Sequence, residues 1–291
     1  MSTVWPDGAT PRDRVGGPVI GVISSKGGSG TTVVAANLAQ VIAAEAGSRV
    51  ALVELDVRAG QLHRLFRLTE PPLLAVLDEE AMLTPQVLER QVSPRPGQVS
   101  VIAAPSHPPE SREIGAGRAT DLVEGLAGVT DAVVVDLGHR VGSAEAAVIR
   151  RADAVLLVVA LTDLGVHSSF DLMATLARRG VTRVIPVLNR TEASSDIDAA
   201  PLRGAFGGEE SVHLPYDPVV VASCMNRGTL FVREHPTAQV SRKLRAVAAR
   251  LVPMPDPAAA DEGPGRTTAR AAPPGAGGGG GHLFGLLDRG A

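Results

Sequence analysis

Short apolar runs alternate along most of the chain with longer segments in which apolar residues recur at helical spacing. The short runs predict buried strands and the longer segments predict helices. The predicted strands are residues 19–23, 50–55, 99–103, 132–137, 154–160, 184–188 and 212–214. The predicted helices are residues 31–46, 117–126, 144–151, 168–179, 218–226 and 237–251. This order is typical of a doubly wound α/β fold, a mostly parallel sheet with helices on both faces, which we expect over residues 18–252.

The two ends of the chain lack this alternation. Residues 1–17 are polar and rich in proline and glycine, and residues 253–281 are rich in proline, alanine and glycine. Because such compositions cannot build a core, we expect a disordered N-terminal tail and a flexible linker. Residues 282–291 form a short amphipathic segment that could contact a membrane weakly, dock on a partner protein, or do neither. Its apolar face would consist of Leu283, Phe284, Leu286 and Leu287.

Composition narrows the class of protein. The 291 residues are 44% hydrophobic, which is enough for one large α/β core. The formal net charge of -3 gives no overall basic field for nucleic acid, although a local patch is compatible with it. Cys224 is the only cysteine, so the chain has no internal disulfide and no cysteine-based zinc site. No apolar run approaches the ~20 residues that span a bilayer, and we expect a cytoplasmic protein, either free or peripheral at the inner face of the membrane.

A glycine-rich stretch after the first predicted strand carries the strongest chemical signal. Residues 25–32 read SKGGSGTT and end at the first predicted helix. In such a loop, small residues let backbone N–H groups curl around phosphate oxygens, and the helix directs its positive end at the same charge. The common pattern G-x-x-x-x-G-K-[ST] survives only at Gly30 and Thr32, because Ser25 and Thr31 replace its first glycine and its lysine. Taken alone, the stretch is equally compatible with a phosphate-binding loop and with an ordinary glycine turn.

Polar residues follow several predicted strands at the carboxyl edge, where ligands bind in sheets of this kind. Asp56 ends the second strand, Asp136 the fourth, and Asn189 follows the sixth. A carboxylate beside a phosphate loop can hold the Mg²⁺ that a nucleotide brings, and we expect Asp136 to do so with the hydroxyl of Thr32. Asp56 would contribute to this metal site or orient an attacking water. A turn or helix cap is the commoner role of a strand-end aspartate.

These residues, together and in this order, resemble the MinD/ParA family of deviant Walker A ATPases. The resemblance covers residues 18–252 and implies an ATP-binding dimer. Within the family it is strongest for the CpaE/TadZ branch associated with Tad (Flp) pilus assembly, in which a KGG-x-G-T-T loop replaces KGG-x-G-K-T. The features that carry it are Lys26-Gly27-Gly28, Leu55-Asp56, Asp136 after three valines, Asn189-Arg190, the sequence LPYDP at 214–218 and NRG at 226–228.

The resemblance also implies roles for particular residues. Lys26 would reach across an ATP-dependent homodimer to the nucleotide of the partner and would serve catalysis together with Asp56. The residues implied to bind the phosphates of ATP are Gly27, Gly28, Ser29, Gly30, Thr31 and Thr32. The residues implied around the base are Asn189, Arg190, Pro215 and Tyr216. An ordinary strand-to-helix loop remains the alternative for the base-binding group.

Thr31 bears most directly on the rate of any hydrolysis. The ammonium that it replaces would sit on the β- and γ-phosphates and tighten its grip as charge develops. Losing such a charged hydrogen bond costs about 1.5–3 kcal/mol in binding, which the loop backbone, Mg²⁺ and base contacts can offset. Losing a donor to the transition state slows the chemistry by about 10²–10³. We therefore expect ATP binding with weak or partner-stimulated hydrolysis.

Two classes of function remain. The first is a nucleotide-switched dimer that positions or assembles a cell-envelope machine, such as pilus, secretion or division machinery, with septum-site and chromosome-partitioning ATPases as alternatives. The second is a metabolic ATP-dependent enzyme on the same fold; the single Cys224 argues against an iron-protein relative, because a bridged cluster needs paired thiolates. DNA binding is not favoured, since a basic helix face is usually only solvated. The basic residues in question are Arg242, Lys243, Arg245 and Arg250.

Overall fold

The computed structural model describes residues 16–58, 60–68, 82–93, 95–104, 114–181, 183–191 and 211–253. The side chains of Arg190 and Thr191 are not among the described atoms. The predicted N-terminal tail, linker and amphipathic C-terminal segment lie outside the described residues, apart from residues 16, 17 and 253.

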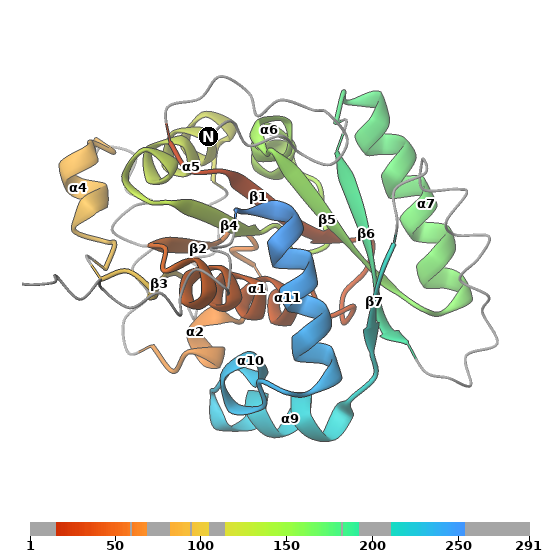
Figure 1. The fold of residues 1–291 in the computed structure, drawn as a ribbon. Helices are drawn as coiled ribbons and strands as arrows, with labels where there is room; N and C mark the ends of the chain where they lie inside the picture. Colours follow the sequence, from red (N-terminus) through yellow and green to blue (C-terminus); the bar gives the residue numbers. More distant parts are fainter. Residues whose placement is uncertain are drawn as a thin grey trace, which may run out of the picture. The chain divides into compact units, whose positions relative to one another are not determined.

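The described residues contain one sheet of seven strands, all paired in parallel (Figure 1). The spatial order is β3-β2-β4-β1-β5-β6-β7. The chain builds one side of β1 with β2, β3 and β4, and then crosses to the other side to form β5, β6 and β7. Ligands of such sheets bind at this change of direction, beyond the carboxyl ends of the strands. The strands are β1 Val19–Ser24, β2 Val50–Glu54, β3 Val99–Ile102, β4 Ala132–Asp136, β5 Ala154–Ala160, β6 Val184–Thr191 and β7 Val212–Pro215.

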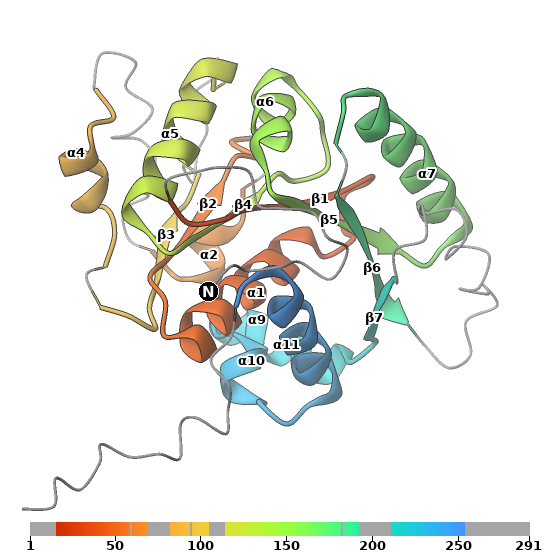
Figure 2. The same ribbon diagram turned by 45° about the horizontal axis from the view of Figure 1, so that its top comes forward.

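Helices cover both faces of the sheet, as Figure 2 shows. On one face lie α5, α6 and α7, and on the other lie α1, α9, α10 and α11. None of the described helices is both long and apolar enough to cross a membrane. The helices are α1 Thr31–Ala46, α2 Leu62–Leu65, α4 Pro85–Glu89, α5 Ala116–Val129, α6 Ser143–Arg151, α7 Asp163–Arg178, α9 Pro218–Arg227, α10 Phe231–Glu234 and α11 Gln239–Leu251.

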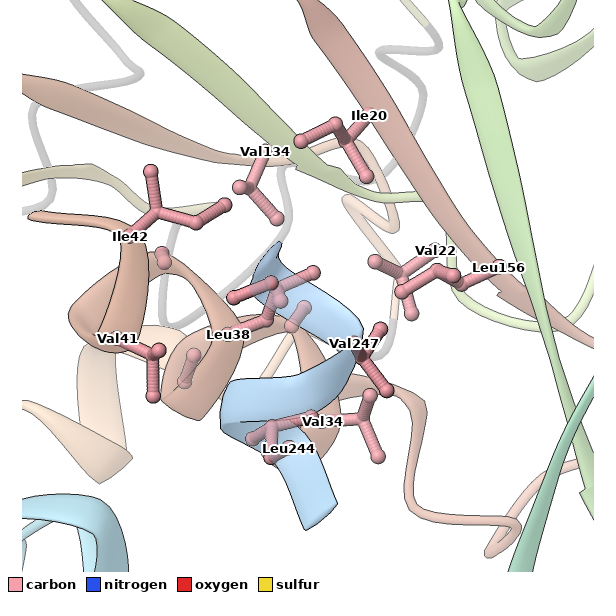
Figure 3. Packing of buried hydrophobic residues seen from close by; sticks show 14 of the residues in the cluster. Ile20, Val22, Val34, Leu38, Val41, Ile42, Val134, Leu156, Leu244 and Val247 are labelled. Atoms are coloured by element: carbon pink, nitrogen blue, oxygen red, sulfur yellow. The ribbon is translucent and has the colours of Figure 1, made fainter. Parts of the chain in front are cut away.

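The core consists of two apolar layers, one on each face of the sheet. Successive strand side chains point to opposite faces, so in β1 Val19 and Ile23 face one layer while Ile20 and Val22 face the other. Because both faces are buried, the central strands are apolar apart from the last residues of β1, β2 and β4. Figure 3 shows Leu38 of α1 packed between the sheet and helix α11.

The structure confirms the predicted doubly wound α/β fold, and the strand bounds differ from the prediction by a few residues at most. The predicted start of the helix at residue 168 is wrong. Helix α7 begins at Asp163, because the hydroxyl of Thr162 accepts the N–H of Gly165 at 3.1 Å and caps the helix earlier. Helix α11 begins at Gln239 rather than at residue 237. The short helices α2, α4 and α10 have too few residues to produce a periodic pattern.

Replacing Leu38 by alanine tests the packing of α1 on the sheet. Leu38 is fully buried, so Leu38→Ala leaves a cavity and is expected to lower the free energy of unfolding by about 2–5 kcal/mol. Urea unfolding followed by circular dichroism measures the change. Val219→Ala, at a side chain that is 78% exposed, is the control and should shift it by less than about 0.5 kcal/mol. Equal effects of the two substitutions would contradict the packing described here.

Candidate functional site

The loop between β1 and α1 turns sharply at two glycines. Gly28 has φ of +79° and Gly30 has φ of +95°, a left-handed backbone that glycine adopts without strain. Gly30 also allows a close approach, because a Cβ atom there would lie 2.5 Å from Nδ2 of Asn189. Gly30 is the N-terminal cap of α1 and has no side chain to satisfy the first N–H groups of the helix. The loop and the helix start therefore present backbone N–H groups, the arrangement that binds phosphate in proteins.

Hydrogen bonds from hydroxyl groups hold this loop on the side that faces the protein interior. The Oγ1 of Thr31 donates to Oγ of Ser24 at 2.8 Å, and Ser24 donates in turn to the carbonyl oxygen of Lys26 at 2.9 Å. Ser29 donates to the same carbonyl at 2.9 Å. Thr31, Ser24 and Ser29 are all buried. The side chain at the position of the missing lysine thus points into the protein, and any contact of Thr31 with phosphate would come from its backbone.

Lys26 is the charged residue of the loop. It is half-buried, and the two residues after it, Gly27 and Gly28, are exposed. Within the described part of the chain, the ammonium of Lys26 has no hydrogen-bond or ion-pair partner. Its positive charge is therefore available to a group outside these residues.

Side-chain oxygen atoms lie beside the loop, at the ends of β2 and β4. Asp136 accepts a hydrogen bond from the hydroxyl of Thr32 and another from the N–H of Gly138 at 3.0 Å. Burial raises the pKa of Asp136 from 3.8 to about 6; the two hydrogen bonds lower it, and the charge of Asp56 adds a smaller rise. The side chain of Asp56 is 20% exposed. The structure thus brings together the three residues predicted for the metal site.

The chemistry of this cluster suits Mg²⁺, which prefers oxygen ligands. Among the described residues, no group of three or more histidine, cysteine, aspartate or glutamate side chains could hold a metal ion. A cation beside Asp136 would therefore complete its shell with water or with oxygens of a bound phosphate, as Mg²⁺ does in nucleotide sites.

Glu54 is a component that sequence reasoning missed. It is fully buried at the end of β2 and lies opposite Asp136 in the β2–β4 register. Its carboxylate accepts the N–H groups of Gln61 and Leu62 at the start of α2 and that of Ala104 after β3. Burial raises the pKa of Glu54 from 4.5 to about 7; these hydrogen bonds lower it, and Asp136 adds to the rise. A charged residue inside an otherwise apolar strand was the signal that could have identified it.

His139 was also missed, because its sequence neighbours give no hint of its surroundings. Its Nδ1 lies 3.9 Å from Oδ2 of Asp56. Its ring faces the loop as well, since a Cβ at Gly27 would lie 3.9 Å from Cε1 and Nε2. His139 therefore stands between the glycine-rich loop and Asp56, with its side chain 31% exposed.

A cavity of about 390 Å³ lies on the other side of the loop, within the size range of small-ligand sites. Gly28, Gly30, Asn189, Pro215 and Tyr216 line it, so three residues predicted to surround the base meet the loop here. Asn189 donates from Nδ2 to the carbonyl of Ser29 at 2.8 Å. The backbone of Arg190 belongs to β6. The rest of the lining is mostly apolar and includes Val33, Val34, Leu214, Val221, Met225 and Phe231.

Comparison with known proteins bears on this arrangement. The CbiA family model, the CobQ/CobB/MinD/ParA nucleotide binding domain, matches residues 20–200. This match spans more than half of the chain and includes the phosphate loop, Asp56, Asp136 and Asn189. The chain belongs to this family.

Two curated proteins are similar to this MinD/ParA-type chain. It is 26% identical over 257 residues to the antiactivator FleN of Pseudomonas aeruginosa, covering 82% of this chain and 88% of FleN. It is 23% identical over 236 residues to an uncharacterised ATP-binding protein of Methanocaldococcus jannaschii, covering 80% of this chain and 87% of that protein.

Solved structures share the fold. A ParA family ATPase from Chlorobium tepidum aligns with a TM-score of 0.72 at 22% identity, over 80% of this chain and 98% of the other. The septum site-determining protein MinD from Pyrococcus horikoshii, complexed with Mg-ADP, aligns with a TM-score of 0.67 at 18% identity, over 79% and 94%. The predicted MinD/ParA family is confirmed, while the CpaE/TadZ branch stays a prediction.

The buried carboxylates predict an unusual dependence of stability on pH. The pKa of Glu54 is higher in the folded chain than in the unfolded chain, so the unfolded chain loses its proton first and stability falls as pH rises between about 4.5 and about 7. In nucleotide-free, metal-free protein, Glu54→Gln should reduce the loss of unfolding free energy between about pH 5 and about pH 8 by about 1–3 kcal/mol. Urea unfolding across this pH range measures it.

The absolute stability of Glu54→Gln is expected to fall as well, because the side-chain amide nitrogen of glutamine cannot accept a hydrogen bond from a backbone N–H group. The slope with pH, and not the stability at one pH, is therefore the diagnostic quantity. Glu89→Gln, at an exposed position on α4, is the control and should keep the wild-type slope. An unchanged slope in Glu54→Gln would refute the raised pKa.

Proposed function

We propose that this protein is an ATP-binding, dimeric switch that positions or assembles a cell-envelope machine. One observation carries the proposal: a phosphate loop, an oxygen cluster and a cavity of small-ligand size meet where the sheet changes direction. The loop N–H groups suit the phosphates of ATP. The cavity beside Asn189 and Tyr216 suits its base.

The residues at the ends of β2 and β4 fit Mg²⁺ as the cofactor. Asp136, with a pKa of about 6, is mostly ionised at neutral pH and would hold the cation together with the hydroxyl of Thr32. Asp56 would orient the attacking water, because it lies at the same edge and is partly open to solvent. When bound, Mg²⁺ neutralises charge on the phosphate oxygens. His139 would sit between these groups and the loop.

Lys26 supports a dimer that forms with the nucleotide. Its ammonium has no partner among the described residues, whereas Thr31 is uncharged and its hydroxyl donates to Ser24. In our proposal Lys26 binds the nucleotide phosphates of a second copy of the chain. Each site then lacks one cation until the dimer forms, which links assembly to ATP.

Hydrolysis is proposed to be weak or to depend on a partner. A transition-state donor such as the missing lysine is typically worth about 10²–10³ in rate. The inward orientation of Thr31 leaves no side-chain replacement for it within the loop. Slow turnover is suited to a switch, because the ATP-bound state then lasts until a partner resets it.

The machine that we propose is the Tad/Flp pilus or a related secretion apparatus, on the basis of the KGG-x-G-T-T loop at residues 26–32. Septum-site determination or chromosome partitioning is the alternative within the same class. For DNA binding, helix α11 offers a small patch, because Arg245 is engaged by Glu45 and by the carbonyl of Pro236. Arg242 and Lys243 are its exposed cations.

One alternative function and one further prediction concern parts of the chain outside the nucleotide site. A metabolic ATP-dependent enzyme remains a second alternative; Cys224 is buried, which does not suit a shared metal cluster. Weak membrane contact through Leu283, Phe284, Leu286 and Leu287 also stays a prediction, since these residues lie outside the described part of the chain.

Lys26→Ala tests the switch. Mg-ATP, but not Mg-ADP, is expected to convert the wild-type chain from monomer to dimer in size-exclusion chromatography with light scattering. Lys26→Ala should still bind Mg-ATP but remain monomeric, because the charge that reaches the second nucleotide is lost. Lys243→Ala is a matched control, as it removes the other of the two lysines in the chain, and should dimerise normally. A dissociation constant for Mg-ATP above the millimolar range in the wild type would refute the proposal.

Two assays separate the candidate machines. In the source organism, loss of the protein should abolish surface pili; Lys243→Ala should restore them and Lys26→Ala should not. Unchanged piliation without the protein would exclude the pilus role. DNA binding over a salt series should show no dependence on ATP, whereas ATP-dependent and salt-sensitive binding would favour chromosome partitioning.

A further inference from the structure

We propose that Ser24 and Thr31 are positioning residues that set the phosphate loop from inside the protein, in place of the outward lysine of the common pattern. Neither residue would touch the nucleotide with its side chain. They matter for binding only if the loop takes the nucleotide proposed above, but their effect on the loop itself is independent of any ligand.

The first support is the convergence of two hydroxyls on one carbonyl. The oxygen of Lys26 accepts hydrogen bonds from both Ser24 and Ser29, at 2.9 Å each, which uses both of its lone pairs. Thr31 donates to Ser24 at 2.8 Å, so the proton of Ser24 is directed toward Lys26 rather than toward Thr31. Ser24 and Ser29 are each 1% exposed and Thr31 is 7% exposed, so water does not compete freely for these bonds.

The second support is the direction in which the peptides of the loop then point. In a trans peptide the C=O and the following N–H point in opposite directions. Because the carbonyl of Lys26 is held toward Ser24 and Ser29, the N–H of Gly27 must point away from the protein interior. The carbonyl of Ser29 is held in the same manner by Asn189 at 2.8 Å, which directs the N–H of Gly30 away from Asn189. Both N–H groups are thereby set before any anion arrives.

A lysine at position 31 could not do the same work. It has no short hydroxyl to donate to Ser24, and its longer side chain would have to leave the buried position that Thr31 occupies. Threonine therefore replaces an outward charge with a loop that needs less ordering when it binds. Such ordering favours bound ATP and bound ADP alike, so it raises affinity without raising the rate of the chemical step.

Four substitutions test this assignment. Thr31→Val removes the hydroxyl of Thr31 at nearly constant side-chain shape, and Thr31→Ser keeps a hydroxyl there. Ser24→Ala removes the oxygen that accepts the hydrogen bond from Thr31. Thr130→Val is the matched control, because Thr130 is a buried threonine whose hydroxyl bonds to Leu126 and Ala132 before β4, at the opposite edge of the sheet. The measurements are amide order parameters of residues 26–30 in nucleotide-free protein by NMR relaxation, dissociation constants for Mg-ATP and Mg-ADP, and the turnover number.

In nucleotide-free protein, the order parameters of the loop should fall from about 0.85 toward 0.6 in Thr31→Val and in Ser24→Ala. The affinities for Mg-ATP and Mg-ADP should weaken by the same factor of about three to ten, as expected for one hydrogen bond, with an unchanged turnover number. Thr31→Ser should restore all of these quantities to within about twofold of the wild type. Thr130→Val should leave the loop and both affinities unaltered.

The outcomes that overturn the inference are distinct from those that overturn the proposed function. Unchanged order parameters and affinities in Thr31→Val would show that Ser24 and Thr31 do not set the loop. A Thr31→Lys variant that binds Mg-ATP more tightly and hydrolyses it faster would show that Thr31 has no positioning role and only lacks the charge of a lysine. A wild-type chain that fails to bind Mg-ATP, with a loop that still loosens in Thr31→Val, would overturn the proposed function and support the positioning by Ser24 and Thr31.

Discussion

Burial of the parallel sheet on both faces determines where this protein can place polar chemistry. The interiors of the central strands carry almost only apolar side chains, because each residue faces a layer of helices on one side or the other. Polar side chains are therefore concentrated where the strands end. At the carboxyl edge, Ser24, Glu54 and Asp136 are the last residues of β1, β2 and β4, and these strands are neighbours. The candidate site is a consequence of this layering, and the loop before α1 adds the N–H groups.

The same burial makes the site costly to maintain without a ligand. The charge of Asp136 acts on Glu54 and that of Asp56 acts on Asp136, while desolvation raises the pKa of both Glu54 and Asp136. Hydrogen bonds from the start of α2, from Ala104 and from Thr32 offset part of this cost. A cation at the edge would offset more of it. The carboxylate of Glu54 also accepts hydrogen bonds from the start of α2 and from the segment after β3, and so holds both segments at the end of β2.

Thr31 gives the loop a character different from that of a common P-loop. Its hydroxyl works inward through Ser24, while Lys26 is left as the outward charge of the loop. Tight holding of the backbone favours retention of a nucleotide, whereas the absence of a second ammonium disfavours rapid transfer of its phosphate. Both tendencies agree with a protein whose bound state has to persist. Asn189 has a similar effect on the loop, since its amide donates a hydrogen bond to the carbonyl of Ser29 where both the loop and Asn189 line the cavity.

The sequence by itself determined the fold class, the strands to within a few residues, and the loop, Asp56, Asp136 and Asn189 as site candidates, because hydrophobic periodicity and strand ends are local properties of the chain. Only the tertiary structure decided what lies between these pieces. Glu54 became a buried partner of Asp136 through strand register, and His139 reached the loop through a turn after β4. The inward direction of Thr31 depends on its hydrogen bond to Ser24 at the end of β1, which forms only when the loop between the two residues has folded. The positions of Glu54 and His139 follow from packing across strands and that of Thr31 from closure of the loop, and no spacing along one strand or helix records either.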